Sequence, residues 1–137
     1  MFVSLLNRKE KLKFLDLAKY MIDIDGAPTD TEKKLLKTIF AEVNDISEEY
    51  TFTKSASKEE TIEFFKNSTQ PVKNIIFLNL ITITLNDEFY NTSEFNFLSQ
   101  IQDAFGISEQ KRHEIMGIIY EERDLQEAAK RVINYNA

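Results

Sequence analysis

The sequence contains no cysteine and no tryptophan, and it has one histidine, three glycines and two prolines in 137 residues. The absence of cysteine excludes disulfides, iron–sulfur clusters, thiolate metal sites and a cysteine nucleophile. One histidine excludes a histidine cluster as a metal site, and three glycines are too few for a glycine-rich phosphate loop. No run approaches the roughly 18 apolar residues of a membrane-spanning helix. What remains is the composition of an ordinary globular domain, with 42% apolar and 29% charged residues.

The first residues place apolar side chains before charged ones, from Met1 to Lys9. A secretory signal has the opposite order, with basic residues followed by an apolar stretch of about 7–15 residues. We therefore expect a cytoplasmic protein without a membrane span.

The net charge of −6 is concentrated in one segment of the chain. Between Asp23 and Glu63 there are 11 acidic and 5 basic residues, whereas the rest of the chain has 12 of each. An acidic segment repels phosphate backbones, so nucleic acid is not an expected partner. Three interpretations stay open, namely a solvated surface, a cation site, and a docking face for a basic protein. The docking residues would be Asp45, Glu48 and Glu49.

Apolar residues recur at every third or fourth position through most of the chain, which is the period of an α-helix. Residues 81–85 also alternate like a strand, but a single strand in a helical chain would have no partner, so we interpret 72–85 as the most buried helix. Capping boxes at Thr29, Ser57 and Asn91 open three helices, and Ser108 caps a long final one. Gly106 is a suitable stop for the helix before it. The pattern predicts an all-α bundle of about six or seven helices.

The chain resembles itself at an offset of 62 residues. Asp25 falls on Asp87 and Glu32 falls on Glu94, in each case where an apolar helix passes through an acidic loop into a capped helix. This spacing predicts two helical hairpins related by a pseudo-twofold axis, within a single domain. The repeat covers approximately residues 12–47 and 74–108, and the domain covers 1–137.

The residues that carry this repeat also resemble the TerB-like family of tellurite-resistance proteins. The likeness covers roughly residues 10–108 and rests on Asp25-Gly26, Glu32 and Leu35-Leu36, with a weaker second copy at Asp87 and Glu94. Family membership implies an all-α fold with pseudo-symmetric halves, a cytoplasmic bacterial or phage-related setting, and a part in stress or defence assemblies. It also implies a divalent-metal site formed by the acidic residues of the two junctions. The second copy departs from the pattern because no glycine follows Asp87.

Carboxylates at these junctions are the ligand type that hard cations prefer. Asp23, Asp25 and Glu32 lie within ten residues, and Asp87 and Glu94 could join them across the pseudo-twofold axis. The ion would be Ca²⁺, Mg²⁺ or Zn²⁺. The spacing is not that of an EF-hand, because the glycine and the terminal glutamate are not where that loop needs them. Helix capping by Glu32 and Glu94, and turn chemistry at Asp25 and Asp87, explain the same residues without a metal.

No catalytic motif is present, so we expect a protein that is not an enzyme. The single imidazole, His113, lies between Arg112 and Glu114 and is expected at the surface. The phenylalanines within helices are expected in the core, whereas Phe89-Tyr90 is a candidate partner site. The core set is Phe64, Phe65, Phe77, Phe95, Phe97 and Phe105.

The sequence thus predicts a non-enzymatic, TerB-like stress or defence protein that acts by binding, with a cation site at the helix junctions. The alternative is an acidic immunity or antitoxin-type protein that masks a basic effector through electrostatic complementarity.

Overall fold

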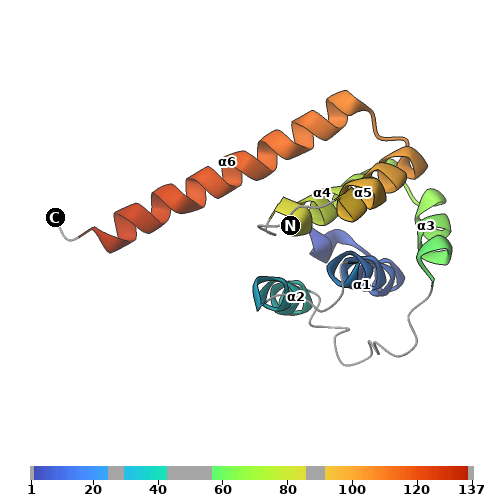
Figure 1. The fold of residues 1–137 in the computed structure, drawn as a ribbon, viewed down its shortest axis with the longest axis horizontal. Coiled ribbons are helices and arrows are strands. Elements are labelled where there is room, and N and C mark those ends of the chain that lie inside the picture. The colour runs from blue at the N-terminus through green and yellow to red at the C-terminus, as the bar shows by residue number, and fades with distance from the viewer. Residues whose placement is uncertain (1, 25–29, 43–56, 86–91, 136–137) are drawn as a thin grey trace. The chain divides into compact units, whose positions relative to one another are not determined.

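The computed structural model describes residues 2–24, 30–42, 57–85 and 92–135, except for five side chains within residues 31–40 (Figure 1). In these ranges every regular element is helical, which confirms the predicted all-α class. A short 3-10 helix, η1, and six α-helices follow one another. Their bounds are η1 Val3–Leu5, α1 Arg8–Asp23, α2 Asp30–Glu42, α3 Lys58–Lys66, α4 Gln70–Leu85, α5 Thr92–Phe105 and α6 Glu109–Asn134.

The chain divides into two compact units. The first, Met1–Gly106, contains η1 and α1 to α5, and the second, Ile107–Ala137, contains α6. Gly106 ends the first unit with a φ of 65°, in the left-handed region that glycine adopts without strain, and this confirms its predicted role as a helix stop. Ser108 then caps α6 as predicted, because its hydroxyl accepts from the Lys111 backbone N–H at 3.1 Å.

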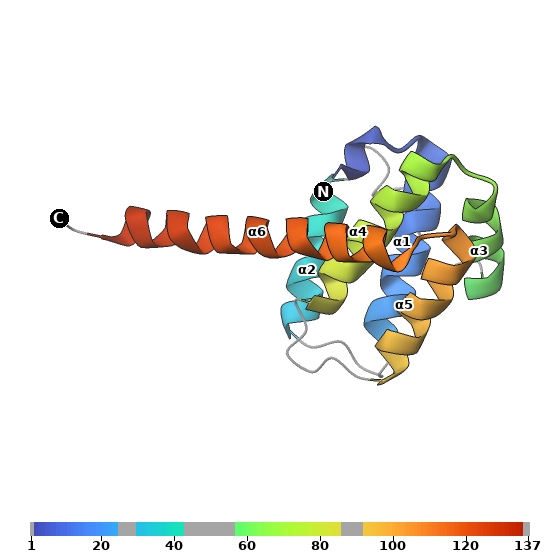
Figure 2. The ribbon, with the colours of Figure 1, turned by 90° about the horizontal axis from the view of Figure 1, so that it is seen from above.

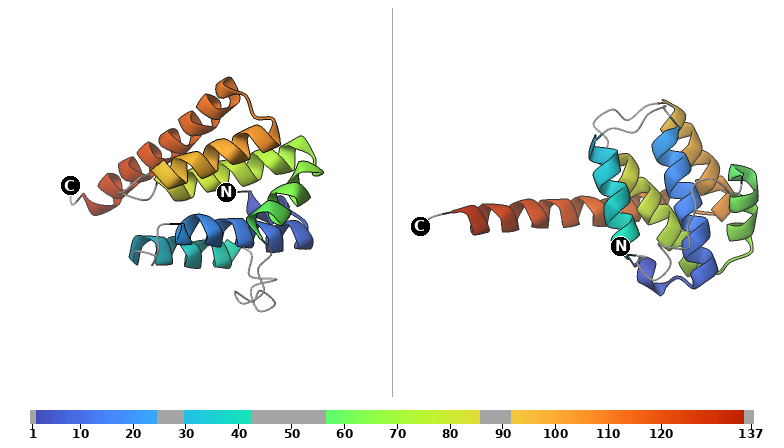
Figure 3. Two further views of the ribbon diagram at one scale, coloured as in Figure 1. Left: turned by 45° about the vertical axis from the view of Figure 1, so that its right-hand side comes forward. Right: turned by 90° about the horizontal axis from the view of Figure 1, so that it is seen from below.

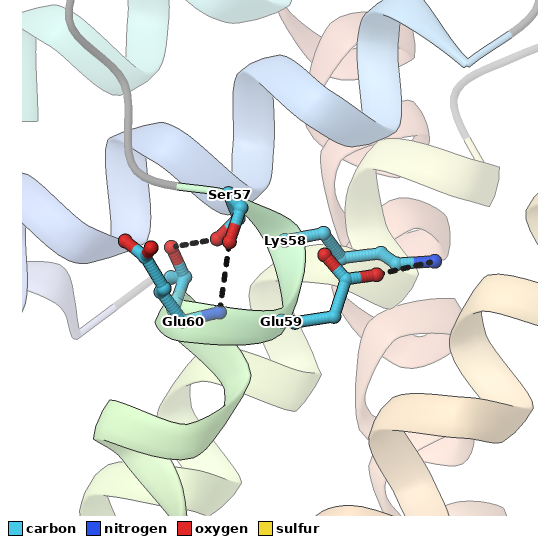
Figure 4. A network of polar contacts seen from close by, with 5 residues as sticks. Ser57, Lys58, Glu59 and Glu60 are labelled. Carbon is cyan, nitrogen blue, oxygen red and sulfur yellow. Dashed lines mark hydrogen bonds and ion pairs between the residues drawn. The ribbon is translucent and has the colours of Figure 1, made fainter.

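The first long helix begins with a capping box that the sequence analysis missed. The Asn7 side chain accepts from the Glu10 N–H at 2.8 Å, and the Glu10 carboxylate accepts from the Asn7 N–H at 2.8 Å. The signal was present, since Asn-x-x-Glu before an apolar run is the expected pattern. At α3, the Ser57 hydroxyl accepts from the Glu60 N–H at 3.2 Å (Figure 4), which confirms the serine half of the predicted capping box. The predicted boxes at Thr29 and Asn91 lie outside the described residues.

We expect Asn7→Ala to lower the free energy of unfolding by about 1 kcal/mol, because α1 would lose the acceptor for one of its first-turn N–H groups. Urea unfolding followed by circular dichroism measures this change. The control is Asn7→Asp, which keeps the acceptor and should stay within a few tenths of a kcal/mol of the wild type. Equal losses for both variants would contradict a capping role.

The segment whose sequence alternates like a strand is helical throughout. It lies within α4, which packs against α1, α3 and α5 and is therefore apolar on most of its surface. Three of its polar side chains bond to carbonyls of the helix itself. The Asn79 amide and the Thr82 and Thr84 hydroxyls donate to the carbonyls four residues earlier, at 2.8, 2.9 and 3.1 Å. This bonding lets threonines alternate with isoleucines inside a buried helix.

Two pairs of helices have bounds that differ by 62 residues, the offset of the sequence repeat. α1 and α4 are both 16 residues long, and Gln70 and Leu85 lie 62 residues after Arg8 and Asp23. α2 and α5 begin 62 residues apart, at Asp30 and Thr92. α1 packs against α4, and the two run side by side in the same direction (Figure 2). The pseudo-twofold axis of the two halves stays a prediction.

α3 is inserted between the two halves and has no counterpart in the repeat. It packs against α1, α4 and α5, and its Phe65 side chain is fully buried. The Phe65 ring lies 5.1 Å from Phe64 and 6.2 Å from Phe105, both in edge-on geometry. On the outside of this cluster, Lys9 and Lys13 of α1 lie 5.3 and 5.9 Å from the Phe64 ring centre. These contacts hold the insertion against the repeat.

The prediction of a buried position is wrong for one of the six phenylalanines, and a second is only partly buried. Phe95 is 47% exposed, whereas Phe97, two residues later, is 3% exposed. Two residues on a helix differ by about 200° in direction, so both side chains could not face one core. Phe64 is half-buried rather than buried. The other four predicted core phenylalanines are confirmed, and these are Phe65, Phe77, Phe97 and Phe105.

Candidate functional site

The candidate site is the end of the Met1–Gly106 unit where α1 and α4 finish and α2 and α5 begin, here called the junction end (Figures 2 and 3). Two long-range contacts bring the described helix ends together. The Met21 sulfur of α1 lies 3.9 Å from the Thr84 hydroxyl oxygen of α4. The Tyr20 and Phe97 rings join α1 to α5, with their centres 4.9 Å apart. Both acidic junctions therefore leave from neighbouring helix ends.

Asp23 is the first of the predicted metal ligands along the chain and the last residue of α1. Its side chain is partly exposed and forms an ion pair with Lys19, one turn earlier on the same helix. The lysine balances the charge of the carboxylate.

Of the two predicted ligands whose side chains the structure describes, Glu94 is the more buried. It lies in the first turn of α5 and is 2% exposed. A carboxylate there is favoured by the N-terminal end of the helix dipole, and this is the position that a capping glutamate occupies. Glu32 occupies the equivalent place in α2, 62 residues earlier, but its side chain is outside the described part of the structure.

The structure describes too few of the predicted ligands to complete a metal site. Within the described ranges, no group of three or more histidine, aspartate or glutamate side chains is placed to hold a metal ion. Asp25 and Asp87, the central pair of the hypothesis, lie outside those ranges. A metal at the junction end therefore stays a prediction.

The predicted partner-binding residues are also outside the described ranges. This applies to Asp45, Glu48 and Glu49 of the acidic segment and to Phe89 and Tyr90 of the second junction. His113 is described, and it is exposed on α6 as the sequence analysis expected.

A lysine–aromatic cluster beside the junction end was not predicted. The Lys58 ammonium nitrogen, at the start of α3, lies 5.3 Å from the Tyr20 ring centre and 5.9 Å from the Phe97 ring centre. Glu59 lies 3.8 Å from the same nitrogen (Figure 4). The cluster joins α1, α3 and α5 through cation–π contacts. No sequence signal could have found it, because its three members are almost 40 residues apart.

No family model matches the chain, and searches of characterised proteins and of solved structures found no significant match. In the described part of the chain, no helix has the length and apolar character needed to cross a membrane.

Proposed function

We propose that this chain is a non-enzymatic, TerB-like binding protein of a stress or defence assembly, and that the junction end is its functional surface. The observation that supports the proposal is the packing of α1 against α4, two helices whose bounds differ by the 62 residues of the sequence repeat. Met21 and Thr84 bring the ends of these two helices together, so the two acidic junctions follow neighbouring helix ends. Duplicated acidic junctions at one surface are suited to binding a ligand through both halves.

The ligand in this proposal is a divalent cation held by carboxylates of the two junctions. The sequence supplies Asp25 and Glu32 from one half and Asp87 and Glu94 from the other. Two helix C-termini, those of α1 and α4, lie next to each other at this end and favour positive charge there. Hard cations take carboxylate and carbonyl oxygens, and both groups occur at such helix ends. The bound cation would link the halves and shape the surface offered to a protein partner.

Native mass spectrometry tests this proposal on the full chain purified without chelator, before and after treatment with EDTA. We expect a stoichiometric mass increment that EDTA removes and that names the ion. Asp25→Asn and Asp87→Asn should each abolish the increment, because each removes a negatively charged ligand. Glu127→Gln, which makes the same change on exposed α6, should leave the increment in place.

A bare polypeptide mass in every sample would refute the cation site. Glu32 and Glu94 would then be ordinary helix caps, and the binding function would be sought in protein partners. Binding of a basic protein that is lost on charge reversal at Asp45, Glu48 and Glu49, with no metal effect, would favour the immunity-type alternative.

A further inference from the structure

The short helix η1 turns one apolar pair inward and a second pair outward. Its backbone bonds run from the Leu5 N–H to the Phe2 carbonyl and from the Leu6 N–H to the Val3 carbonyl, both at 3.0 Å. Because a 3-10 helix has three residues per turn, side chains three residues apart lie one above the other. Val3 and Leu6 are buried, whereas Phe2 and Leu5 are 57% and 70% exposed. We call the outward residues, Phe2 and Leu5, the η1 pair.

Phe2 is held in a backbone conformation that disfavours it. Its φ is 62°, and in the described part of the chain no other residue except glycine has a positive φ. The left-handed region is costly for a residue with a β-carbon. Such strain persists only where the surrounding structure imposes it, and it is concentrated at positions that contact ligands. The exposed ring therefore marks η1 as a candidate binding element.

A basic cluster follows the η1 pair directly. Residues 8–13 contain four basic side chains, those of Arg8, Lys9, Lys11 and Lys13, and one acidic side chain, that of Glu10. At 1.5 Å per residue the four basic residues start within about 8 Å of one another along α1. The Cα–Cβ bonds of a helix tilt toward its N-terminus, so these side chains lean back toward η1.

This positive charge is local, on a chain whose net charge is −6. The Phe64 ring of α3 gathers the Lys9 and Lys13 ammonium groups, which lie 5.3 and 5.9 Å from its centre. Asp23, at the junction end, lies about 22 Å from Arg8 along α1. That distance is more than twice the roughly 8 Å over which salt screens charges at physiological ionic strength. The acidic residues of the junction end therefore do little to cancel the basic cluster.

We propose that the η1 end of α1 docks on an anionic lipid bilayer, with the η1 pair inserted among the lipids and the basic cluster against the headgroups (Figure 2). Exposed apolar side chains beside basic ones are the combination by which proteins bind the surface of anionic membranes. The proposal concerns the start of α1 alone and does not depend on the junction end.

The small size of the η1 pair favours lipid over a macromolecular partner. A stable protein interface takes about 800 Å² from each partner, which two projecting side chains do not supply. Lipids need no complementary surface, because their chains pack around single apolar side chains. A nucleic acid would use the positive charge but would leave Leu5 without apolar surroundings.

Co-sedimentation of the full chain with vesicles measures the binding. We compare vesicles of phosphatidylcholine alone with vesicles of phosphatidylcholine and phosphatidylserine in equal parts. The chain should bind the mixed vesicles only, and added salt should weaken the binding because it screens the basic cluster.

Leu5→Ser should lower the partition coefficient on mixed vesicles about tenfold, because one apolar side chain no longer enters the lipid. The matched control is Leu125→Ser on α6, since Leu125 is also 70% exposed, and it should change the coefficient less than about twofold. Circular dichroism checks that both variants keep the wild-type helix content.

Lys9→Gln tests the charge separately. It should lower the coefficient about fivefold, the contribution of one basic residue at an anionic surface. The control is Lys33→Gln, which removes the same charge from an exposed position at the junction end and should leave the coefficient within about twofold of the wild type.

Insertion is read directly with a tryptophan, since the chain has none of its own. The emission of Leu5→Trp should move to shorter wavelength when mixed vesicles are added, because the indole leaves water. The emission of Leu125→Trp should not move.

No binding to the mixed vesicles would overturn the proposal, as would equal binding to phosphatidylcholine alone. Binding that falls in Lys9→Gln but is unchanged in Leu5→Ser, with no emission shift in Leu5→Trp, would also overturn it. Charge alone would then be responsible, and an acidic protein or a nucleic acid would fit the basic cluster equally well.

Discussion

Phe65→Ala should destabilise the Met1–Gly106 unit by about 3–5 kcal/mol. Phe65 is fully buried, and its ring contacts Phe64 of α3 and Phe105 of α5. Truncation removes the buried ring and leaves a cavity among side chains that can close only in part, because helices on several sides fix its walls. Urea unfolding followed by circular dichroism, with the linear extrapolation to zero denaturant, measures the loss.

The control for this substitution is Phe95→Ala. Phe95 is 47% exposed, so the same truncation should cost less than about 1 kcal/mol. A loss at Phe65 no larger than that at Phe95 would mean that α3 is not anchored through this ring. If Phe65→Ala loses about as much free energy as the whole stability of a small domain, the variant will not fold. Phe65→Leu, which is expected to lose less stability, then supplies the measurement.

Met21→Asp should unfold the unit at the seam between the two halves. Met21 is 1% exposed, and its sulfur contacts Thr84 near the end of α4. A carboxylate placed there would lose its water with only one hydroxyl nearby, so we expect a cost of at least about 4 kcal/mol. The readouts are the midpoint of thermal unfolding and the dispersion of the amide proton spectrum.

Met21→Leu is the matched control, because it keeps the apolar character and nearly the volume of the side chain, and it should cost less than about 1.5 kcal/mol. A folded Met21→Asp chain with a wild-type melting temperature would show that α1 and α4 do not meet at this end. The proposal that the two junctions start from neighbouring helix ends would then be wrong as well.

Helix positions were largely predictable from the sequence. The helical apolar period was predicted through most of the chain, and the first long helix is observed at Arg8–Asp23, because apolar period and capping chemistry are local properties. The sequence of α4 was ambiguous, because its Ile-Thr alternation also fits a strand. The prediction of a helix rested on the absence of a partner strand. The prediction for Phe95 was wrong because this residue was assigned to the apolar face of its helix. Phe95 points in a different direction from the buried Phe97.

For the candidate site, the sequence predicted only which residues of the first half correspond to which residues of the second. The offset between Asp25 and Asp87 predicted which residues correspond, and the helix bounds repeat with that offset. The offset did not predict which residues of different helices contact one another. The neighbouring positions of Met21 and Thr84, and of Lys58 and the Tyr20 and Phe97 rings, depend on packing between segments far apart in the chain.

α3 joins parts of the unit that are far apart in the sequence. It packs against α1, α4 and α5, and its Phe65 ring meets Phe105, 40 residues later. A contact between such distant residues closes a long loop, and closing a loop has an entropic cost. The packing of α3 therefore ties the folding of the first part of the unit to that of the last.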